Sequence, residues 1–336
     1  MELTFTYGTS QRFRRRHGDL NLIGRAVGAE YPLERATYRL NGGPQHSFYV
    51  EPVPDPGLDW TVEYKNSPAV NRLKDQGDFN IEIPVTEREL APGGNALRVI
   101  VRDGGGTAAE ALVELDWNPE PVSLPLELAD LSGYAHIQEV GQVVNGAFDL
   151  DRGGNTIRSR EPVYPDSLLL LGSAHGSQAA TYRVVFTGFD GVKWLGPSDF
   201  FAGNEAADPP IGIKPGWSSA GMAALNPHGE ARSFLAWGDH SGTEREWVVK
   251  TEPPARFAVR PGVPYRVRHR VLFREGVDTV SFRIWPEGEA EPDDWLCEES
   301  DAGVAPELPR HTAAAFGLFQ HSGRAIEWSD IRVVSL

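Results

Sequence analysis

Acidic residues crowd into residues 287–294, a short segment between two tryptophans. Its glutamates alternate, and alternation in a strand would point their carboxylates into one groove, about 5 Å apart, as in a retaining glycosidase. Clustered loop carboxylates also suit a hard cation, so the segment could instead form a calcium loop. The ligands of that loop would be Glu289, Glu291, Asp293 and Asp294. Prolines and a glycine interrupt the segment, however, which favours a solvated acidic turn.

The segment 264–273 alternates basic and apolar residues. Arg268 and Arg270 fall on one face of the expected strand, and Arg283 and Trp285 join them if the next strand pairs with it. Such a face could bind an anionic glycan through guanidinium–carboxylate pairs and ring stacking. Alternatively, the arginines pair with acids on neighbouring strands, which is common on exposed sheet faces.

Tyr265 and His269 lie four residues apart on the opposite, apolar face of the same expected strand. In a lyase, a tyrosine and a histidine in a groove act as acid and base, and Arg283 would complete the catalytic set. The same two residue types also fill protein cores by bonding one polar tip, and the apolar face favours this second interpretation. The sequence contains no Ser-His-Asp order, P-loop, dinucleotide fingerprint or HExxH motif.

Aromatic and histidine residues also occur where expected strands turn into loops. Trp237 and His240 lie at one such boundary, and His321 ends another strand. Trp217 lies in a loop rich in glycine and proline. Because loop rims often carry binding residues, these four are candidate sugar contacts, with structural turn aromatics as the alternative.

The acidity of the chain limits its partners. A formal net charge of −15 over 336 residues argues against nucleic acid, since phosphate binding requires a basic surface. The single cysteine, Cys297, excludes an internal disulfide and a cysteine-based zinc site. No apolar run approaches the roughly 20 residues that span a bilayer, so no membrane span is expected. No signal peptide follows Met1, which predicts a cytoplasmic protein unless the signal of a secreted or cell-surface protein has been removed.

The elements that must position these residues are strands, because period-2 alternation dominates the chain. Short strands between turn clusters over residues 1–118 indicate an immunoglobulin-like β-sandwich. The proline-rich residues 119–124 predict a linker without strand pairing. About eleven further strands over residues 125–336, with 136–144 among them, fit one large jelly roll. The basic residues 11–19 are expected to form an exposed loop near the domain interface.

Several short motifs follow one another along the chain in a characteristic order. They are YRLNGGP and NRLKDQGDFNIEI in the first part, and PVYPDSLLLLGS, FRIWPEGEAEPDDW and FGLFQHSGRAIEWSDIRV in the second. This series resembles bacterial two-domain proteins with an N-terminal immunoglobulin-like sandwich and a C-terminal laminin-G-like, concanavalin-A-like domain. The segment 199–222 departs from the more aromatic pattern of those proteins. The resemblance implies the fold, but lectins, carbohydrate-binding modules, glycoside hydrolases and polysaccharide lyases all use it.

We therefore predict an all-β protein with two β-sandwich domains that binds a polysaccharide or other glycan, an anionic one included. No cofactor is predicted, with a calcium ion as the alternative. The predicted ligand-binding residues are Trp217, Trp237, His240, Arg268, Arg270, Arg283, Trp285 and His321. One alternative is a glycoside hydrolase or polysaccharide lyase that uses Tyr265, His269 and Arg283. Another is a structural or protein-interaction module, which would show a large apolar patch in place of a groove.

Overall fold

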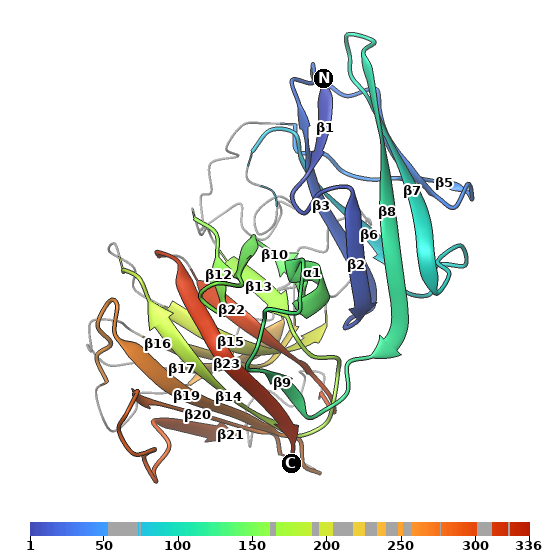
Figure 1. Ribbon diagram of the computed structural model, residues 1–336. Coiled ribbons are helices and arrows are strands. Elements are labelled where there is room, and N and C mark those ends of the chain that lie inside the picture. Colours follow the sequence, from blue (N-terminus) through green and yellow to red (C-terminus); the bar gives the residue numbers. More distant parts are fainter. Residues whose placement is uncertain are drawn as a thin grey trace.

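The computed structural model confirms that the chain is built almost entirely of β-strands (Figure 1). Within the described residues the only helix, α1, spans Ile137–Val140. The described part of the chain contains no helix that is long and apolar enough to cross a membrane. The described residues are 1–52, 73, 75–161, 166–189, 195–203, 218–225, 234–239, 248–250, 257–275, 277–300, 311–321 and 323–336.

Two sheets form an N-terminal sandwich. The five-stranded sheet has the order β2 (Ser10–Arg15), β8 (Ala108–Pro121), β7 (Gly93–Arg102), β4 (Arg35–Leu40) and β5 (Gln45–Ser47). The three-stranded sheet has the order β1 (Glu2–Phe5), β3 (Asp19–Val27) and β6 (Asp78–Pro84). Alternate residues of both sheets meet in one apolar core, in which Phe79, Val99 and Val113 are fully buried. Only the β2–β8 pair is parallel among the described strand pairs of this sandwich.

Two larger sheets form a C-terminal sandwich. The seven-stranded sheet has the order β10 (Gln142–Asn145), β13 (Asp166–Leu170), β22 (Ala315–His321), β15 (Leu195–Gly203), β16 (Ser218–Leu225), β17 (Phe234–Asp239) and β18 (Val248–Lys250). The eight-stranded sheet comprises β11 (Phe148–Asp151), β12 (Thr156–Ser159), β23 (Ile326–Ser335), β14 (Gln178–Phe186), β19 (Pro264–Leu272), β20 (Thr279–Pro286) and β21 (Cys297–Ser300), with β9 (Leu126–Leu128) beside β23. Aromatic rings from the two sheets meet in the core, as between Tyr182 and Phe316.

The proline-rich segment differs from the expected free linker. Strand β8 continues to Pro121, which lies opposite Arg15 of β2. Pairing survives the prolines because β7 no longer accompanies β8 beyond Trp117, so this part of β8 has a neighbour on one side only. Further on, the carbonyl of Val122 bonds the ring of His175 at 2.7 Å. The segment is therefore held against the C-terminal sandwich.

The basic residues 11–19 form a strand and a turn, not the exposed loop expected. Arg16 extends from this turn into the C-terminal sandwich, where it is 5% exposed. Its guanidinium donates hydrogen bonds to the carbonyl oxygens of Leu171 (3.1 Å), Glu139 (3.1 Å) and Val140 (2.8 Å). Burial, followed by repulsion from a neighbouring arginine, lowers the pKa of Arg16 to about 9.

Two further contacts cross between the sandwiches. The hydroxyl of Tyr7 accepts a hydrogen bond from the backbone N–H of Phe148 at 3.0 Å, and its ring packs on the C-terminal core beside Ile23. The side-chain amide of Gln142 donates to the carbonyl of Asp19 at 2.5 Å. The interface thus combines apolar packing with buried hydrogen bonds, so the two sandwiches hold a fixed orientation.

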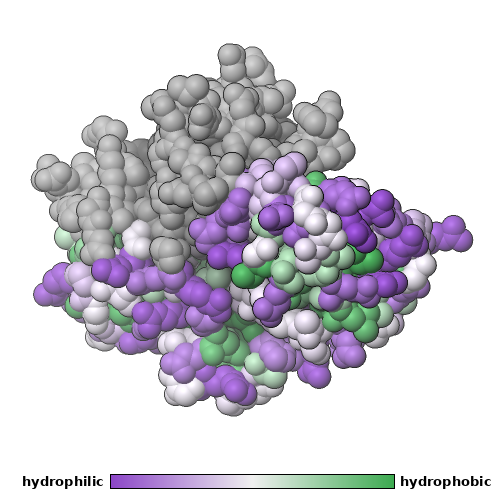
Figure 2. Space-filling view, turned by 90° about the horizontal axis from the view of Figure 1, so that it is seen from above, coloured by the Kyte–Doolittle hydropathy of each residue, from purple (hydrophilic) through white to green (hydrophobic). Residues whose placement is uncertain are grey.

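The surface is predominantly polar. Seen from above in Figure 2, green apolar areas are small and separated by purple polar residues. Across the described part of the chain, only Val27, Leu112 and Leu336 are large hydrophobic residues with exposed side chains. These three residues come from separate elements, so they do not form the extended patch expected of an assembly protein.

Candidate functional site

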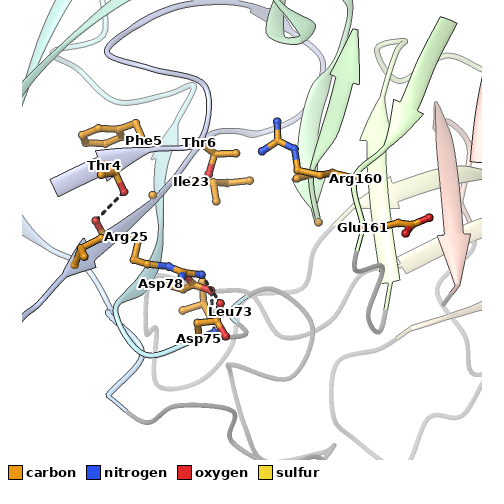
Figure 3. A pocket seen from close by; sticks show the side chains of 14 residues that line it. Thr4, Phe5, Thr6, Ile23, Arg25, Leu73, Asp75, Asp78, Arg160 and Glu161 are labelled. Atoms are coloured by element: carbon orange, nitrogen blue, oxygen red, sulfur yellow. Dashed lines mark hydrogen bonds and ion pairs between the residues drawn. The ribbon is translucent and has the colours of Figure 1, made fainter. Parts of the chain in front are cut away.

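A cavity of about 480 Å³ lies between the two sandwiches, and we refer to it as the interdomain cleft. Its N-terminal wall consists of the end of β1, part of β3 and the side chains of Leu73, Asp75 and Asp78. Its C-terminal wall consists of residues 146–147 and 160–161. Figure 3 shows Arg25 and two aspartates on one wall and Arg160 reaching from the other. The chain thus brings charged groups from distant parts of the sequence to one open site.

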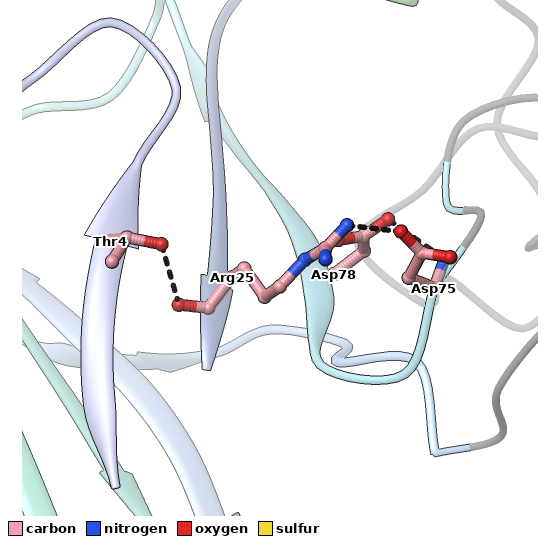
Figure 4. Close-up of polar contacts among 4 residues, drawn as sticks. All are labelled: Thr4, Arg25, Asp75 and Asp78. Carbon is pink, nitrogen blue, oxygen red and sulfur yellow. Dashed lines mark hydrogen bonds and ion pairs between the residues drawn. The ribbon is translucent and has the colours of Figure 1, made fainter. Parts of the chain in front are cut away.

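Arg25 organises the N-terminal wall (Figure 4). Its Nε lies 2.6 Å from Oδ1 of Asp78 and its Nη2 lies 2.5 Å from Oδ2 of Asp75. The backbone N–H of Asp75 also donates to Asp78 at 2.9 Å, which fixes the two carboxylates side by side. Burial alone would lower the pKa of Arg25, but the two carboxylates outweigh it and raise the pKa. The wall therefore presents carboxylate oxygens whose positions are fixed by these contacts.

The C-terminal wall carries one cation and one anion. Arg160 pairs with Asp149, its Nε lying 3.2 Å from the carboxylate, and this hydrogen bonding raises the pKa of Arg160. Glu161 accepts hydrogen bonds from the backbone N–H of Ala325 (2.9 Å) and from Arg324 (3.1 Å). The N–H of Ala325 and then Arg324 lower the pKa of Glu161, so its carboxyl stays ionised at neutral pH.

Two glycines shape the cleft. A Cβ on Gly24 would lie 2.5 Å from a ring carbon of Phe79, so only glycine lets β1, β3 and that ring approach so closely. Gly146 has φ of +71° and a Cβ there would lie 2.6 Å from Cβ of Ser167. Gly24 is required because a larger residue would not fit. Gly146 is required for the same reason and because of its positive φ.

The chemistry available in the cleft is that of polar recognition. Carboxylates of Asp75, Asp78 and Glu161 accept hydrogen bonds, and the guanidinium groups of Arg25 and Arg160 donate them. Thr4 and Phe5 add a hydroxyl and a ring to the lining. Since every one of these charged groups already has an ionic partner, the cleft suits a neutral ligand with several hydroxyl groups.

The predicted arginine face exists, on the outer side of the eight-stranded sheet. Strands β19 and β20 pair with Arg268 opposite Arg283, and alternate residues of β19 are buried while its arginines are half-buried. Arg270 lies on the same face, opposite Ser281. Trp285, in contrast, is only 9% exposed and offers no stacking platform. The period-2 pattern therefore predicted the face correctly but not the availability of its tryptophan.

The acidic segment 287–294 is the partner of the arginine face. Glu291 lies between Arg268, at 2.7 Å from its Nε, and Arg283, which it also contacts. The ring of Trp295 lies under the guanidinium groups of Arg270 (4.5 Å) and Arg283 (4.4 Å). The arginines of this face are thus paired with acids, as the alternative interpretation predicted. The binding of an anionic glycan at this face stays a prediction.

The acidic segment offers no sign of the calcium loop. Glu291 is committed to two arginines, and Asp293 gives its backbone carbonyl to Arg283 at 3.1 Å. Glu289 and Asp294 lie on the exposed turn. Among the described residues, no group of three histidine, cysteine or acidic side chains is placed to hold a metal ion.

Tyr265 and His269 lie in the core between the C-terminal sheets, not in a groove. His269 is fully buried, its Nδ1 lies 2.9 Å from Oγ of Ser198, and burial lowers its pKa to about 3. The hydroxyl of Tyr265 accepts from the backbone N–H of Arg260 at 2.8 Å. A polysaccharide cannot reach either side chain, so the catalytic arrangement expected of these residues and Arg283 is not formed.

The other four predicted contacts lie outside the described part of the chain, either wholly or in their side chains. Trp217 and His240 fall outside the described residues. Trp237 lies on β17, opposite Val248 of β18, and His321 ends β22, opposite Asp166, but their side chains are outside the described part. Their role as sugar contacts stays a prediction.

The residues of the interdomain cleft were not identified from the sequence. Arg25 lies in an ordinary strand, and Arg160 follows a strand more than a hundred residues away. The pair Asp75 and Asp78, set around a turn glycine at the start of β6, was the one local signal available. A site made where two domains meet leaves no fixed spacing in the sequence.

No protein-family model and no curated protein matches this chain. Among solved structures, the carbohydrate-binding module CBM66 from Bacillus subtilis is similar with a TM-score of 0.38 and 10% identity, over 58% of this chain and 96% of that module. The carbohydrate recognition domain of Emp46p in its potassium-bound form gives 0.39 and 12%, over 62% and 97%. A family 7 alginate lyase, A1-II′, gives 0.31 and 13%, over 55% and 80%. With TM-scores below 0.5, these similarities carry no argument about the function of this chain.

Proposed function

We propose that this protein is a non-catalytic carbohydrate-binding protein and that the interdomain cleft holds the sugar. The observation that carries the proposal is the open cavity of about 480 Å³, which presents fixed donors and acceptors from both sandwiches. Small-molecule sites typically measure about 300–1,000 Å³ and orient the ligand with a few fixed polar groups. Sugar hydroxyls both donate and accept, so they match a site that offers carboxylates beside guanidinium groups.

A neutral glycan fits this cleft better than an anionic one. Asp75 and Asp78 already bind Arg25, and Asp149 already binds Arg160. An added anion would compete with these carboxylates in a chain of net charge −15. On the arginine face, an anionic glycan would likewise have to displace Glu291. We therefore place the sugar in the cleft and treat an anionic ligand there as the less favoured case.

The enzyme alternative has less support in the chemistry of the cleft. A glycoside hydrolase needs one carboxyl that stays protonated near neutral pH to serve as general acid. The pKa of Glu161 is lowered instead, and the aspartates of the opposite wall are bound to Arg25. The lyase alternative required an accessible tyrosine and histidine, and Tyr265 and His269 are buried.

The test combines a glycan array and a polysaccharide pull-down with mass spectrometry of every bound glycan, with calcium and with chelator. The variant Arg25→Gln removes the cation that holds both aspartates, and we expect it to weaken binding at least about tenfold, since hydrogen bonds to charged groups are involved. Arg98→Gln is the matched control, because Arg98 forms an exposed pair with Glu110 (2.6 Å) on the outer side of the five-stranded sheet.

Each outcome separates the hypotheses. Retention of a neutral glycan that Arg25→Gln weakens and Arg98→Gln leaves unchanged supports the proposal. Equal binding by both variants removes the cleft as the site. New oligosaccharide fragments would show catalysis, and no retention of any glycan would leave a protein-interaction role as the better hypothesis.

A further inference from the structure

A second hollow of about 450 Å³ lies on the N-terminal sandwich, formed by residues 31–37 and 45–52. It shares no lining residue with the interdomain cleft. Its lining includes Tyr31, Tyr49, Arg35, Gln45 and Ser47. The hollow thus combines two aromatic rings, one cation and two neutral polar side chains with one carboxylate, Glu34, which pairs with Arg102. Nothing in the proposed function uses it.

The two tyrosines supply the ring surfaces. Both are partly exposed, and the hydroxyl oxygen of Tyr31 is itself buried, so the part of Tyr31 that lines the hollow is its ring. The hydroxyl of Tyr49 donates to Glu51 at 3.4 Å, and its ring packs beside Leu73. Burial and then Glu51 raise the pKa of both tyrosines to about 12, so both rings remain neutral. Neutral aromatic rings held in place this way suit the apolar faces of a pyranose ring.

Arg35 supplies an available charge. It is exposed, and within the described residues no carboxylate pairs with it. Across the strand pair it lies opposite Arg102, whose guanidinium is already 3.6 Å from Glu34. Glu34 is thus engaged by Arg102, and the guanidinium of Arg35 remains available to a ligand. A guanidinium fork of this kind binds a carboxylate through two parallel hydrogen bonds.

The edge strand β5 supplies the neutral polar groups. Ser47 lies opposite Thr37, two residues along β4 from Arg35, so it shares the sheet face of that arginine. Gln45 lies opposite Arg39 on the same face. Both Gln45 and Ser47 are exposed and border the hollow, where their side chains can bond ligand hydroxyls.

We propose that this hollow is a second binding site, specific for an acidic sugar residue such as a uronic acid. Arg35 binds the carboxylate, Tyr31 and Tyr49 pack on the ring, and Gln45 and Ser47 bond the hydroxyls. A phosphorylated peptide is the less suitable ligand, because phosphate-recognition sites gather several arginines and this hollow offers one unpaired arginine. The proposal stands apart from the interdomain cleft, which suits neutral sugars.

The experiment is isothermal titration calorimetry with oligosaccharides of polygalacturonate, alginate, hyaluronan and heparin, at low and physiological salt. Neutral galactose oligosaccharides and a phosphotyrosine peptide serve as comparison ligands. The variant Arg35→Gln removes the fork at an exposed position, and we expect it to weaken acidic-sugar binding at least about tenfold. Arg98→Gln is the matched control, since Arg98 lies on the same sheet, pairs with Glu110 (2.6 Å) and does not border the hollow. Tyr31→Phe should retain binding, because the hydroxyl is buried.

Binding of at least one acidic oligosaccharide that Arg35→Gln weakens and Arg98→Gln preserves supports the proposal. Three results overturn it: no acidic oligosaccharide binds at millimolar concentration, Arg35→Gln binds as tightly as the unchanged protein, or only the phosphopeptide binds. Loss of neutral-sugar binding in Arg25→Gln with acidic-sugar binding intact would show that the two sites are independent. Failure of one proposal therefore does not imply failure of the other.

Discussion

The pairing of the acidic segment with the arginine face makes Glu291 the residue whose loss should matter most there. Replacing Glu291 by Gln removes the charge shared by Arg268 and Arg283, whose side chains are 37% and 15% exposed. Exposed ion pairs contribute about 0.2–1 kcal/mol, whereas removing one partner of a buried pair costs about 3–5 kcal/mol. Because this pair lies between those limits, we expect Glu291→Gln to lower the free energy of unfolding by about 1–3 kcal/mol.

The matched control is Glu289→Gln, two residues away on the same turn. Glu289 is exposed, and within the described residues its carboxylate has no ionic partner. We expect its replacement to change the free energy of unfolding by less than about 0.5 kcal/mol, as for surface positions in general. The comparison therefore separates a specific contact from a general effect of removing negative charge.

Urea unfolding followed by tryptophan fluorescence measures both variants, and Trp295 between Arg270 and Arg283 reports on the turn itself. In 1 M salt, where the Debye length is about 3 Å, the deficit of Glu291→Gln should shrink without disappearing, because the contact is partly buried. Coincident unfolding curves for the two variants would refute the view that the acidic segment is the structural partner of the arginines. So would a complete loss of the difference in salt.

Two further predictions follow from buried groups. Because the pKa of His269 is about 3 in the folded protein and about 6.5 when unfolded, only the unfolded chain takes up its proton between these values. The free energy of unfolding should thus fall as the pH drops below 6.5, by about 2 kcal/mol at pH 5 from this group. The variant His269→Phe should flatten that part of the pH profile. An unchanged profile would contradict the conclusion that His269 is buried in its neutral form. Gly146→Ala should destabilise the fold by about 2–4 kcal/mol, through its positive φ and its contact with Ser167, whereas Gly153→Ala, with ordinary contacts, should have little effect in thermal unfolding.

The sequence predicted those features that depend on neighbouring residues. Alternation in β19 and β20 correctly assigned Arg268, Arg270 and Arg283 to one sheet face, because side chains in a strand alternate whatever the fold. The same rule failed at residues 136–144, where α1 precedes β10, since a four-residue helix is too short to show a helical period.

Contacts between distant segments were beyond the reach of sequence patterns. Nothing in the spacing of Arg25 and Arg160 indicates that they line one cleft. For the arginine face, the sequence predicted acidic partners but not which acidic residues these are. The same holds for His269, because the sequence pattern around an inward-facing histidine is the same in a core and in a groove. Only the packing of whole sheets distinguishes these cases.

The buried guanidinium of Arg16 affects how the two sandwiches can be recombined during evolution. Domains that recombine freely in evolution are joined by exposed linkers and share a small interface. Either domain can therefore be exchanged without compensating substitutions in the other. Here, a gene rearrangement that replaced the N-terminal sandwich would remove the donor for three carbonyls, those of Leu171, Glu139 and Val140. The carbonyls of Leu171 and Val140 are bonded in a buried position, and that of Glu139 in a partly buried one. An unsatisfied buried acceptor costs about 1–3 kcal/mol, so the loss is a large part of the stability of a typical domain. The two sandwiches are therefore expected to be inherited together, and a relative of one half should carry the other half beside it.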